Sequence, residues 1–187
     1  TDIGIVGNTI IKIGNINSEN SIRVIDATDL IVSPGFIDTH AHLDPMDNLI
    51  NLSHAESHVR QGVTTSFGGP DGRGAPLKYG FKEFLDTIEK VGVGMNMGFL
   101  TGHNKIRRVV MNLDNRKPTE DALETMKTMA SDAMDEGAFG ISTGLKYLPG
   151  NFSEVDEVIE ISKEISKKGG IYTSHLRDEG LKIIDAV

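Results

Sequence analysis

The feature that most constrains this chain is an alternation of strand-like and helix-like segments that begins after Pro34. The expected strands are residues 35–43, 63–67, 93–100, 138–146 and 171–177. The expected helices, whose apolar residues recur every three or four positions, are residues 53–62, 81–91, 119–136 and 153–169, with another near Gly180. This alternation predicts an α/β fold with a parallel sheet, either closed into a barrel or open and doubly wound.

Residues 1–34 follow a different pattern. Short runs rich in isoleucine and valine are separated by the turn signals Gly7-Asn8 and Gly14-Asn15, which predicts small strands. We expect two more strands at residues 22–26 and 30–32. The chain is therefore expected to divide into a small sheet or half-sandwich, residues 1–34, and an α/β domain, residues 35–187.

Composition excludes several classes of function. Asp and Glu number 27 against 19 Lys and Arg, a net charge of −8, and a nucleic-acid binder needs a basic face. No apolar run approaches the roughly 20 residues of a membrane helix, and no signal-peptide pattern is seen. We expect a cytoplasmic protein that binds neither nucleic acid nor membrane. With no cysteine in the chain, disulfides, cysteine zinc sites and a thiol nucleophile are excluded.

The strongest chemical signal is the segment Asp38-Thr39-His40-Ala41-His42, at the end of the first expected strand. Alternate strand residues share a face, so Asp38, His40 and His42 should point the same way. The two imidazoles would then lie roughly 6–7 Å apart along the strand. Both could bind one metal ion at about 2.0–2.1 Å. The alternative is a pair of partly buried, hydrogen-bonded histidines, and the neighbouring Asp38 favours the metal.

Two later strands carry further candidates. His175 lies at the carboxyl end of the fifth expected strand, where parallel α/β folds place their sites, although it could be a hydrogen-bonded core histidine. In the fourth expected strand Gly140, Ser142 and Gly144 share one face, and Lys146 follows on it. A buried ammonium beside a divalent cation is repelled. Lys146 is therefore deprotonated, carboxylated to a metal-bridging carbamate, or extended to the rim and paired with an acid.

Gly102-His103-Asn104 follows the third expected strand, and Arg107 and Arg108 come shortly after it. At the carboxyl end of a strand these residues could face a substrate, and the arginine pair could anchor a carboxylate. A charged surface loop is the alternative.

Two motifs resemble known sites but depart from them. His54 and His58 are four positions apart on an expected helix, but a zinc-protease helix needs Glu directly after the first histidine. We expect them on a solvated face. Residues 68–74 are glycine-rich but lack the Lys-Ser/Thr ending of a phosphate loop. We expect a flexible strand-to-helix loop at the rim.

Together these motifs resemble the amidohydrolase superfamily, and within it the D-aminoacylase (N-acyl-D-amino-acid deacylase) group. The matching segments are residues 34–42, 102–104, 137–147 and 172–180. The fold of this family is a (β/α)8 TIM-type barrel with a small β-sandwich. The resemblance therefore implies a partial barrel of about five βα units in residues 35–187, preceded by sandwich strands in residues 1–34.

The resemblance also implies one or two Zn²⁺ ions. The implied metal ligands are His40, His42, Lys146 and His175, with Lys146 as a possible carboxylated bridge. Many members of the group bridge instead through a cysteine after the second strand, which this chain lacks. The residues expected to contact the substrate are His103, Asn104, Tyr147 and Arg177.

The implied reaction is hydrolysis of a non-peptide C–N bond in a small N-acyl-D-amino acid by metal-activated water. The family's proton-shuttling Asp and a further His ligand are expected beyond Val187, so no catalytic residue is predicted here and the chain alone is expected to be inactive. One alternative is a cyclic amidase of the hydantoinase or dihydroorotase kind. Another is a non-catalytic metal-binding module. The sequence predicts no oligomeric state.

Overall fold

In a computed structural model the chain divides into two compact units, Thr1–Pro34 and Gly35–Val187. The structure describes residues 1–43, 51, 53–75 and 80–186. In the first unit, strands β1 (Asp2–Val6) and β2 (Thr9–Gly14) form an antiparallel hairpin. The turn Gly7-Asn8 joins them, and the left-handed φ of Gly7, +61°, is one that glycine adopts without steric cost.

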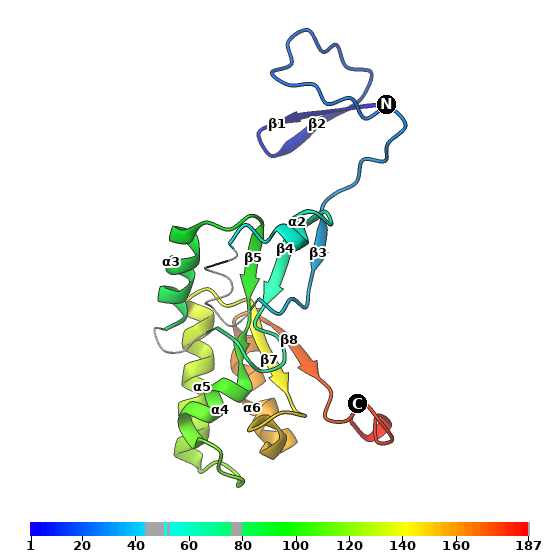
Figure 1. The fold of residues 1–187 in the computed structure, drawn as a ribbon. Helices are drawn as coiled ribbons and strands as arrows, with labels where there is room; N and C mark the ends of the chain where they lie inside the picture. Colours follow the sequence, from blue (N-terminus) through cyan, green and yellow to red (C-terminus); the bar gives the residue numbers. More distant parts are fainter. Residues whose placement is uncertain (44–50, 52, 76–79, 187) are drawn as a thin grey trace. The chain divides into compact units, whose positions relative to one another are not determined.

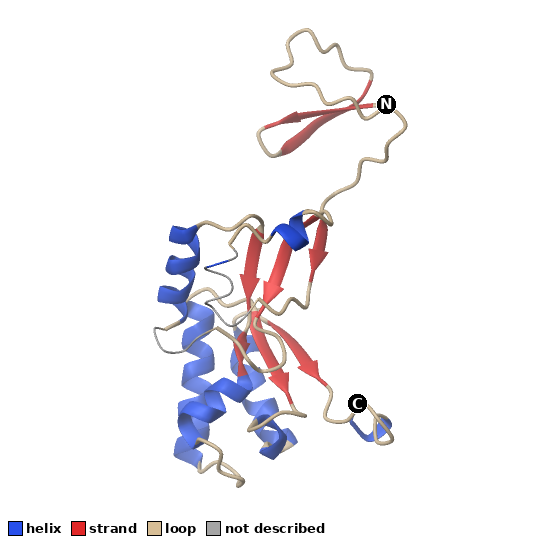
Figure 2. Cartoon of the chain, viewed as in Figure 1, coloured by secondary structure: helices blue, strands red, loops and turns tan. Residues whose placement is uncertain are grey.

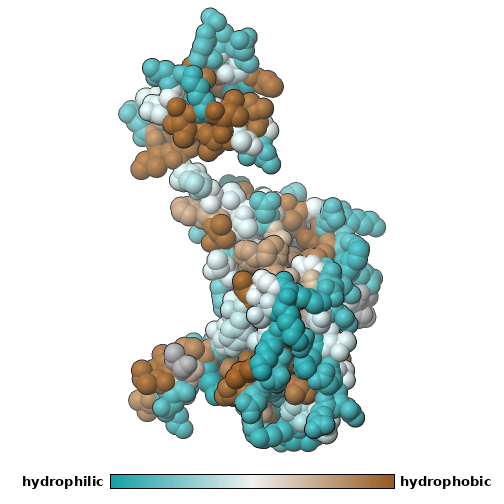
Figure 3. Space-filling model, turned by 180° about the vertical axis from the view of Figure 1, so that it is seen from behind, coloured by the Kyte–Doolittle hydropathy of each residue, from teal (hydrophilic) through white to brown (hydrophobic). Residues whose placement is uncertain are grey.

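The two further strands predicted at residues 22–26 and 30–32 are not formed: among the described residues of this unit, β1 pairs only with β2. An extended segment becomes a strand only when a second backbone supplies its hydrogen bonds. Ile22, Val24 and Ile31 are exposed. Apolar side chains gather visibly on this unit (Figure 3).

The second unit contains parallel strands that follow chain order, which confirms the predicted mixed α/β class (Figure 1). The strands are β3 (Phe36–Asp38), β4 (Val63–Gly68), β5 (Asn96–Phe99), β6 (Thr101–Gly102), β7 (Gly140–Gly144) and β8 (Ile171–His175). They form two parallel sheets, β3-β4-β5 and β6-β7-β8. Leu100 separates β5 from β6, and its N–H donates to the Gly68 carbonyl at 3.0 Å.

The longer helices lie on one side of these strands (Figure 2). They are α3 (Phe81–Val91), α4 (His103–Met111), α5 (Glu120–Asp135) and α6 (Val155–Lys167). The shorter helical segments are α2 (Glu56–Val59) and the 3₁₀ helices at Gly150–Phe152 and Ile184–Ala186. Periodicity predicted α3, α5 and α6 closely. No helix was predicted for the α4 segment, for which a charged surface loop was one alternative, and the helix expected near Gly180 is only the second 3₁₀ turn.

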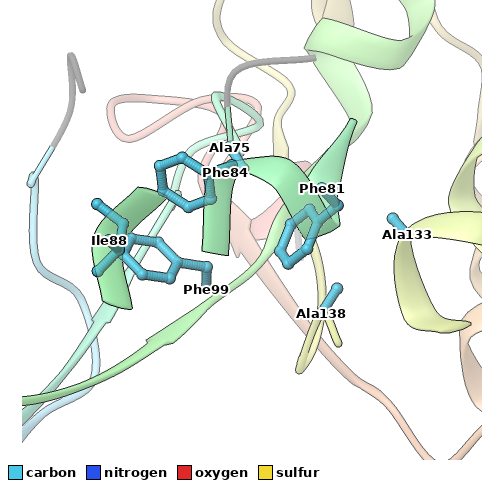
Figure 4. Close-up of a cluster of buried hydrophobic side chains, with 7 residues drawn as sticks. All are labelled: Ala75, Phe81, Phe84, Ile88, Phe99, Ala133 and Ala138. Carbon is cyan, nitrogen blue, oxygen red and sulfur yellow. The ribbon is translucent and has the colours of Figure 1, made fainter. Parts of the chain in front are cut away.

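Two clusters of buried side chains hold the helices to the strands. The first, shown in Figure 4, consists of Ala75, Phe81, Phe84, Ile88, Phe99, Ala133 and Ala138. Within it the rings of Phe84 and Phe99 meet edge to face at 4.7 Å. The second joins α4, α5, α6 and β7 through Ile106, Met111, Met126, Ala130, Ile141, Ile161 and Ile165. Burial of each large apolar side chain contributes about 1.5–3 kcal/mol, so this layer fixes the strands and the residues at their ends.

Several strands are shorter than predicted, and this changes where candidate residues lie. Strand β3 ends at Asp38, so His40 and His42 follow the strand instead of belonging to it. Strand β7 ends at Gly144, so Lys146 also lies in the turn that follows. His175 is the last residue of β8, as its predicted position requires. None of the helices in the described residues has both the length and the apolarity needed to cross a membrane.

Candidate metal centre

The predicted imidazole ligands converge on a buried carboxylate, that of Asp71. Its Oδ2 lies 3.2 Å from His42 Nε2, and its Oδ1 lies 3.5 Å from His40 Nε2 and 3.5 Å from His175 Nδ1. His40 and His42 follow β3, Asp71 follows β4, and His175 ends β8. They meet because each ends or follows a parallel strand, and the sites of parallel α/β folds lie at the carboxyl ends of the strands.

The backbone after β3 aims the first two histidines. The Ala41 N–H donates to the Phe67 carbonyl at 2.9 Å, which holds the segment beside β4. The His40 N–H donates to Asp38 Oδ1 at 3.0 Å, so Asp38 stabilises the turn. The imidazole rings lie 5.3 Å apart and edge to face, and both side chains are about half exposed. His40 and His42 do lie together, as predicted. The turn after β3 brings them together, and not the alternation of side chains along a strand.

Asp38 also lies near a residue expected to be solvated. His58 Nε2 is 3.8 Å from Asp38 Oδ2, and the His58 side chain is only partly exposed. The short helix α2 therefore presents His58 toward the end of β3.

Sequence reasoning missed Asp71 because its glycine-rich loop was expected to be flexible. The loop is buried apart from Arg73, and Asp71 adopts a left-handed φ of +56°, which Asp tolerates better than most residues. Ser142 Oγ on β7 donates to the Gly69 carbonyl at 2.6 Å and accepts the Gly72 N–H at 3.0 Å. A Cβ at Gly72 would overlap the Asn104 side chain. An acid among glycines at a strand's carboxyl end was the available signal.

His175 connects the cluster to three neighbours. Its Nε2 lies 3.4 Å from Glu179 Oε1 and 3.3 Å from the Tyr147 hydroxyl. Lys146 Nζ donates to Glu179 Oε2 at 3.2 Å, and the Lys146 side chain is half exposed. The hydrogen bond from Lys146, together with the nearby charge of His175, lowers the pKa of Glu179. The lysine therefore has the rim position and acid partner that formed one of its alternatives.

His103 and Asn104 begin helix α4 instead of lying in a loop, and both are buried. His103 Nε2 meets Glu157 Oε1 on α6 at 2.8 Å, so its side chain faces that helix. Asn104 donates from Nδ2 to the Gly144 and Tyr147 carbonyls, at 2.8 and 3.2 Å, and accepts the Gly144 N–H at 3.0 Å. Asn104 thus secures the turn that carries Lys146 and Tyr147.

Arg107 is fully buried, which corrects its assignment as a substrate anchor. Its Nη1 donates to Glu157 Oε2, and its Nη2 donates to the Asp114 and Arg116 carbonyls at 3.3 and 2.8 Å. Burial raises the pKa of Glu157, but the bonds from His103 and Arg107 outweigh it and the net pKa is lowered. Arg108 is exposed.

Arg177, also expected to contact substrate, binds backbone carbonyls beyond β7. Its Nη1 and Nη2 donate to the carbonyls of Asn151 and Ser153 at 3.3 and 3.1 Å. Arg177 also borders a shallow surface hollow of about 360 Å³ with residues 153–156.

The Asp71 cluster fits a metal ion by its chemistry and its spacing. His40, His42 and Asp71 offer ligand atoms that all lie within 4.8 Å of one another. Ligands at about 2.0–2.1 Å from one ion are about 3.4 Å apart in a tetrahedron, and the contacts from His40 to Oδ1 and from His42 to Oδ2 of the same carboxylate are 3.5 and 3.2 Å. Asp71 Oδ1 is buried without a hydrogen-bond partner, a condition that a cation would relieve. Imidazole nitrogens and a carboxylate oxygen are ligands that zinc accepts.

Comparison with known proteins gives the chain its relatives, although no family model matches it. It is 32% identical over its whole length to a D-aminoacylase of Alcaligenes xylosoxydans xylosoxydans and covers 42% of that protein. A solved D-aminoacylase described with a binuclear metal centre matches 98% of this chain with a TM-score of 0.88 and 31% identity, over 43% of its own length. An allantoinase of Enterococcus faecalis is 26% identical over 94% of the chain and 37% of its own length.

An N-acyl-D-glutamate deacylase of Bordetella bronchiseptica was solved with zinc and a phosphonate that mimics the tetrahedral intermediate. It matches 82% of this chain and 36% of its own length, with a TM-score of 0.75 and 26% identity. The chain spans about two fifths of the curated D-aminoacylase. These matches confirm the resemblance found in the motifs: the relatives of this chain are D-aminoacylases, and over the part of the TIM-barrel-type fold that it spans its structure is similar to that of a D-aminoacylase, an amidohydrolase.

Proposed function

We propose that this chain supplies metal ligands to a zinc-dependent hydrolase that removes the acyl group from N-acyl-D-amino acids. The observation that carries the proposal is the convergence of His40, His42 and His175 on the Asp71 carboxylate at the carboxyl ends of parallel strands. The D-aminoacylase relatives support it, because their similarity runs through every segment that carries these residues. In this proposal residues 35–187 form part of a barrel, and residues 1–34 belong to a small sandwich.

A bound zinc ion supplies Lewis-acid activation of water and of the amide carbonyl. The protein residues do the positioning. His40, His42 and Asp71 would hold the cation at the ends of the strands, with His175 beside Asp71, and the charge of Asp71 would offset part of the cation's charge. His40 and His42 are half exposed, which leaves this edge open to a small substrate.

The Tyr147 hydroxyl lies beside His175, so we propose that it contacts the substrate near the cation. Arg177 is proposed as a second contact from the same rim, with its guanidinium oriented by two carbonyls. His103 and Asn104 are proposed to position the rim residues and not to touch the substrate. Their side chains are buried and bonded to Glu157 and to the Gly144 carbonyl, respectively. The prediction that Lys146 is a carboxylated bridge remains open here.

The test is hydrolysis of N-acetyl-D-amino acids by the full-length protein loaded with zinc, measured as the acetate released. We expect turnover of the D-isomers, little turnover of the L-isomers, and loss of activity in the His40→Ala variant. Glu160→Ala, a change at a partly exposed residue of α6, is the matched control. Absence of deacylation by a folded, zinc-loaded protein would contradict the proposal.

A second candidate is a cyclic amidase, favoured by the match to an allantoinase at lower identity. Activity on allantoin or dihydroorotate alone would select it. A third, the non-catalytic metal-binding module, predicts zinc uptake without turnover of either class of amide.

A further inference from the structure

Asp71 occupies a position that the sequence did not assign to any ligand. Its side chain is only 6% exposed, yet it lies among histidines whose side chains are 17–53% exposed. Oδ1 has no hydrogen-bond partner, although Asp71 is held by a loop whose other polar groups are bonded to Ser142 and to the start of α4. The loop therefore presents at the strand edge a buried carboxylate oxygen that has no hydrogen-bond partner.

The contacts of Asp71 extend to two separate imidazole groups. His40 and His42 form one group with it, in which all ligand atoms lie within 4.8 Å of one another. His175 falls outside that group, although its Nδ1 is 3.5 Å from Asp71 Oδ1. One carboxylate thus faces the histidines of the first strand and the histidine of the last, which is the placement required of a ligand shared between two cations.

Lys146 has a different environment. Its Nζ binds Glu179, which also lies 3.4 Å from His175, and its side chain is half exposed. Carboxylation of Nζ would replace this ion pair with two anions facing each other, an unfavourable exchange. Asp71 already carries the negative charge that a carbamate would provide.

We propose that Asp71, and not a carboxylated Lys146, is the ligand shared between two cation sites in this protein, one at His40 and His42 and the other at His175. This rests on the proposed function, because it takes the cluster to be a metal centre. The side chain of Asp71 is short, so the backbone of its loop must lie close to both cation sites. Ser142 holds the loop in place through its bonds to Gly69 and Gly72.

The test is Co²⁺ binding to the purified protein, measured by isothermal titration calorimetry and by visible absorption. Asp71→Asn keeps the size of the side chain and tolerates a positive φ, so it should fold. Lys146→Gln cannot be carboxylated. Asp86→Asn, an exposed aspartate on α3, is the matched control, and circular dichroism reports the fold of each variant.

We expect two equivalents of Co²⁺ for the wild type, the control and Lys146→Gln, and at most one equivalent, bound at least tenfold more weakly, for Asp71→Asn. Asp71→Cys gives a positive readout: the chain has no other cysteine, so a thiolate-to-cobalt charge-transfer band must come from position 71. We expect that band to develop in the Asp71→Cys variant.

Loss of one equivalent in Lys146→Gln with none lost in Asp71→Asn would overturn the inference and restore the lysine bridge. A wild type that binds a single equivalent would overturn the shared role. If Asp71→Asn binds like the wild type, the inference fails while the proposed function stands; if the folded wild type binds no Co²⁺, the proposed function fails with it.

Discussion

Two buried carboxylates in the Gly35–Val187 unit both lie beside histidine, and the protein treats them in opposite ways. Both oxygens of Glu157 are bonded, Oε1 to His103 at 2.8 Å and Oε2 to the buried guanidinium of Arg107. Asp71 has an oxygen without any hydrogen-bond partner, and the imidazoles around it are partly open to solvent. Glu157 is therefore paired with cationic or hydrogen-bonding side chains through both of its oxygens, whereas Asp71 keeps one oxygen that can accept a further partner.

This difference separates framework from site more clearly than burial does. A buried charge is costly unless it is paired, so a fold retains an unpaired one only where something else completes it. Glu157 joins α4 to α6, the helices that support β7 and the turn after it. Asp71 lies in the loop after β4, and Ser142 on β7 holds that loop.

Removal of the framework acid should destabilise the fold most. Glu157→Ala leaves Arg107 buried without its countercharge, and we expect the free energy of unfolding to fall by about 3–5 kcal/mol. Urea unfolding at neutral pH measures this, with Glu160→Ala, a change at a partly exposed residue of the same helix, as control. A loss no larger than that of the control would show that α4 and α6 are held by apolar packing alone.

Removal of the site acid should act only through the metal. Zinc at about 100 times its Kd should raise the free energy of unfolding of the wild type by about 2.7 kcal/mol. We expect most of this gain to disappear in Asp71→Asn, while the metal-free stability of that variant stays near that of the wild type. Urea unfolding with and without zinc checks both parts. A variant that is equally destabilised in both conditions would place Asp71 in the framework.

Ser142 connects the two regions, because it joins β7 to the loop of Asp71. Ser142→Ala leaves the buried Gly72 N–H and Gly69 carbonyl without this partner, and we expect a loss of about 1–3 kcal/mol. Zinc affinity should fall as well, since the loop is held less firmly. Chemical unfolding and calorimetry measure the two effects, with the exposed Ser166→Ala as control. Unchanged zinc affinity would show that the loop keeps its shape without this hydroxyl.

The smallest expected effect is on pH dependence. The folded pKa of Glu157 is lowered from the ordinary 4.5, so between the two values the unfolded chain binds more protons. Its stabilisation is therefore complete above about pH 4.5 and is lost as the pH falls through the lowered pKa. Unfolding midpoints of the wild type and Glu157→Gln should converge as the medium is acidified. A difference that stays constant down to the acid transition would contradict this assignment.

How far the sequence led depended on whether a feature is local. Periodicity placed α3 and α6 well, since an apolar stripe every three or four residues is sufficient to seat a helix against a sheet. Helix α4 was missed because its inward residues include the charged Arg107, whose partner Glu157 lies 50 positions away. Polar residues that are buried in pairs interrupt the very pattern by which a helix is recognised.

The sequence alone predicted the α/β alternation, the resemblance to D-aminoacylases and the three imidazoles of the candidate site. These depend on short-range spacing and on residue types that tolerate few alternatives. Three features became visible only in the folded structure. Lys146 lies at the rim beside Glu179, His103 bonds to Glu157 inside the protein, and Asp71 lies among the histidines. The loop of Asp71 takes its shape from Ser142, about 70 positions along the chain, so no local pattern could reveal where its carboxylate points.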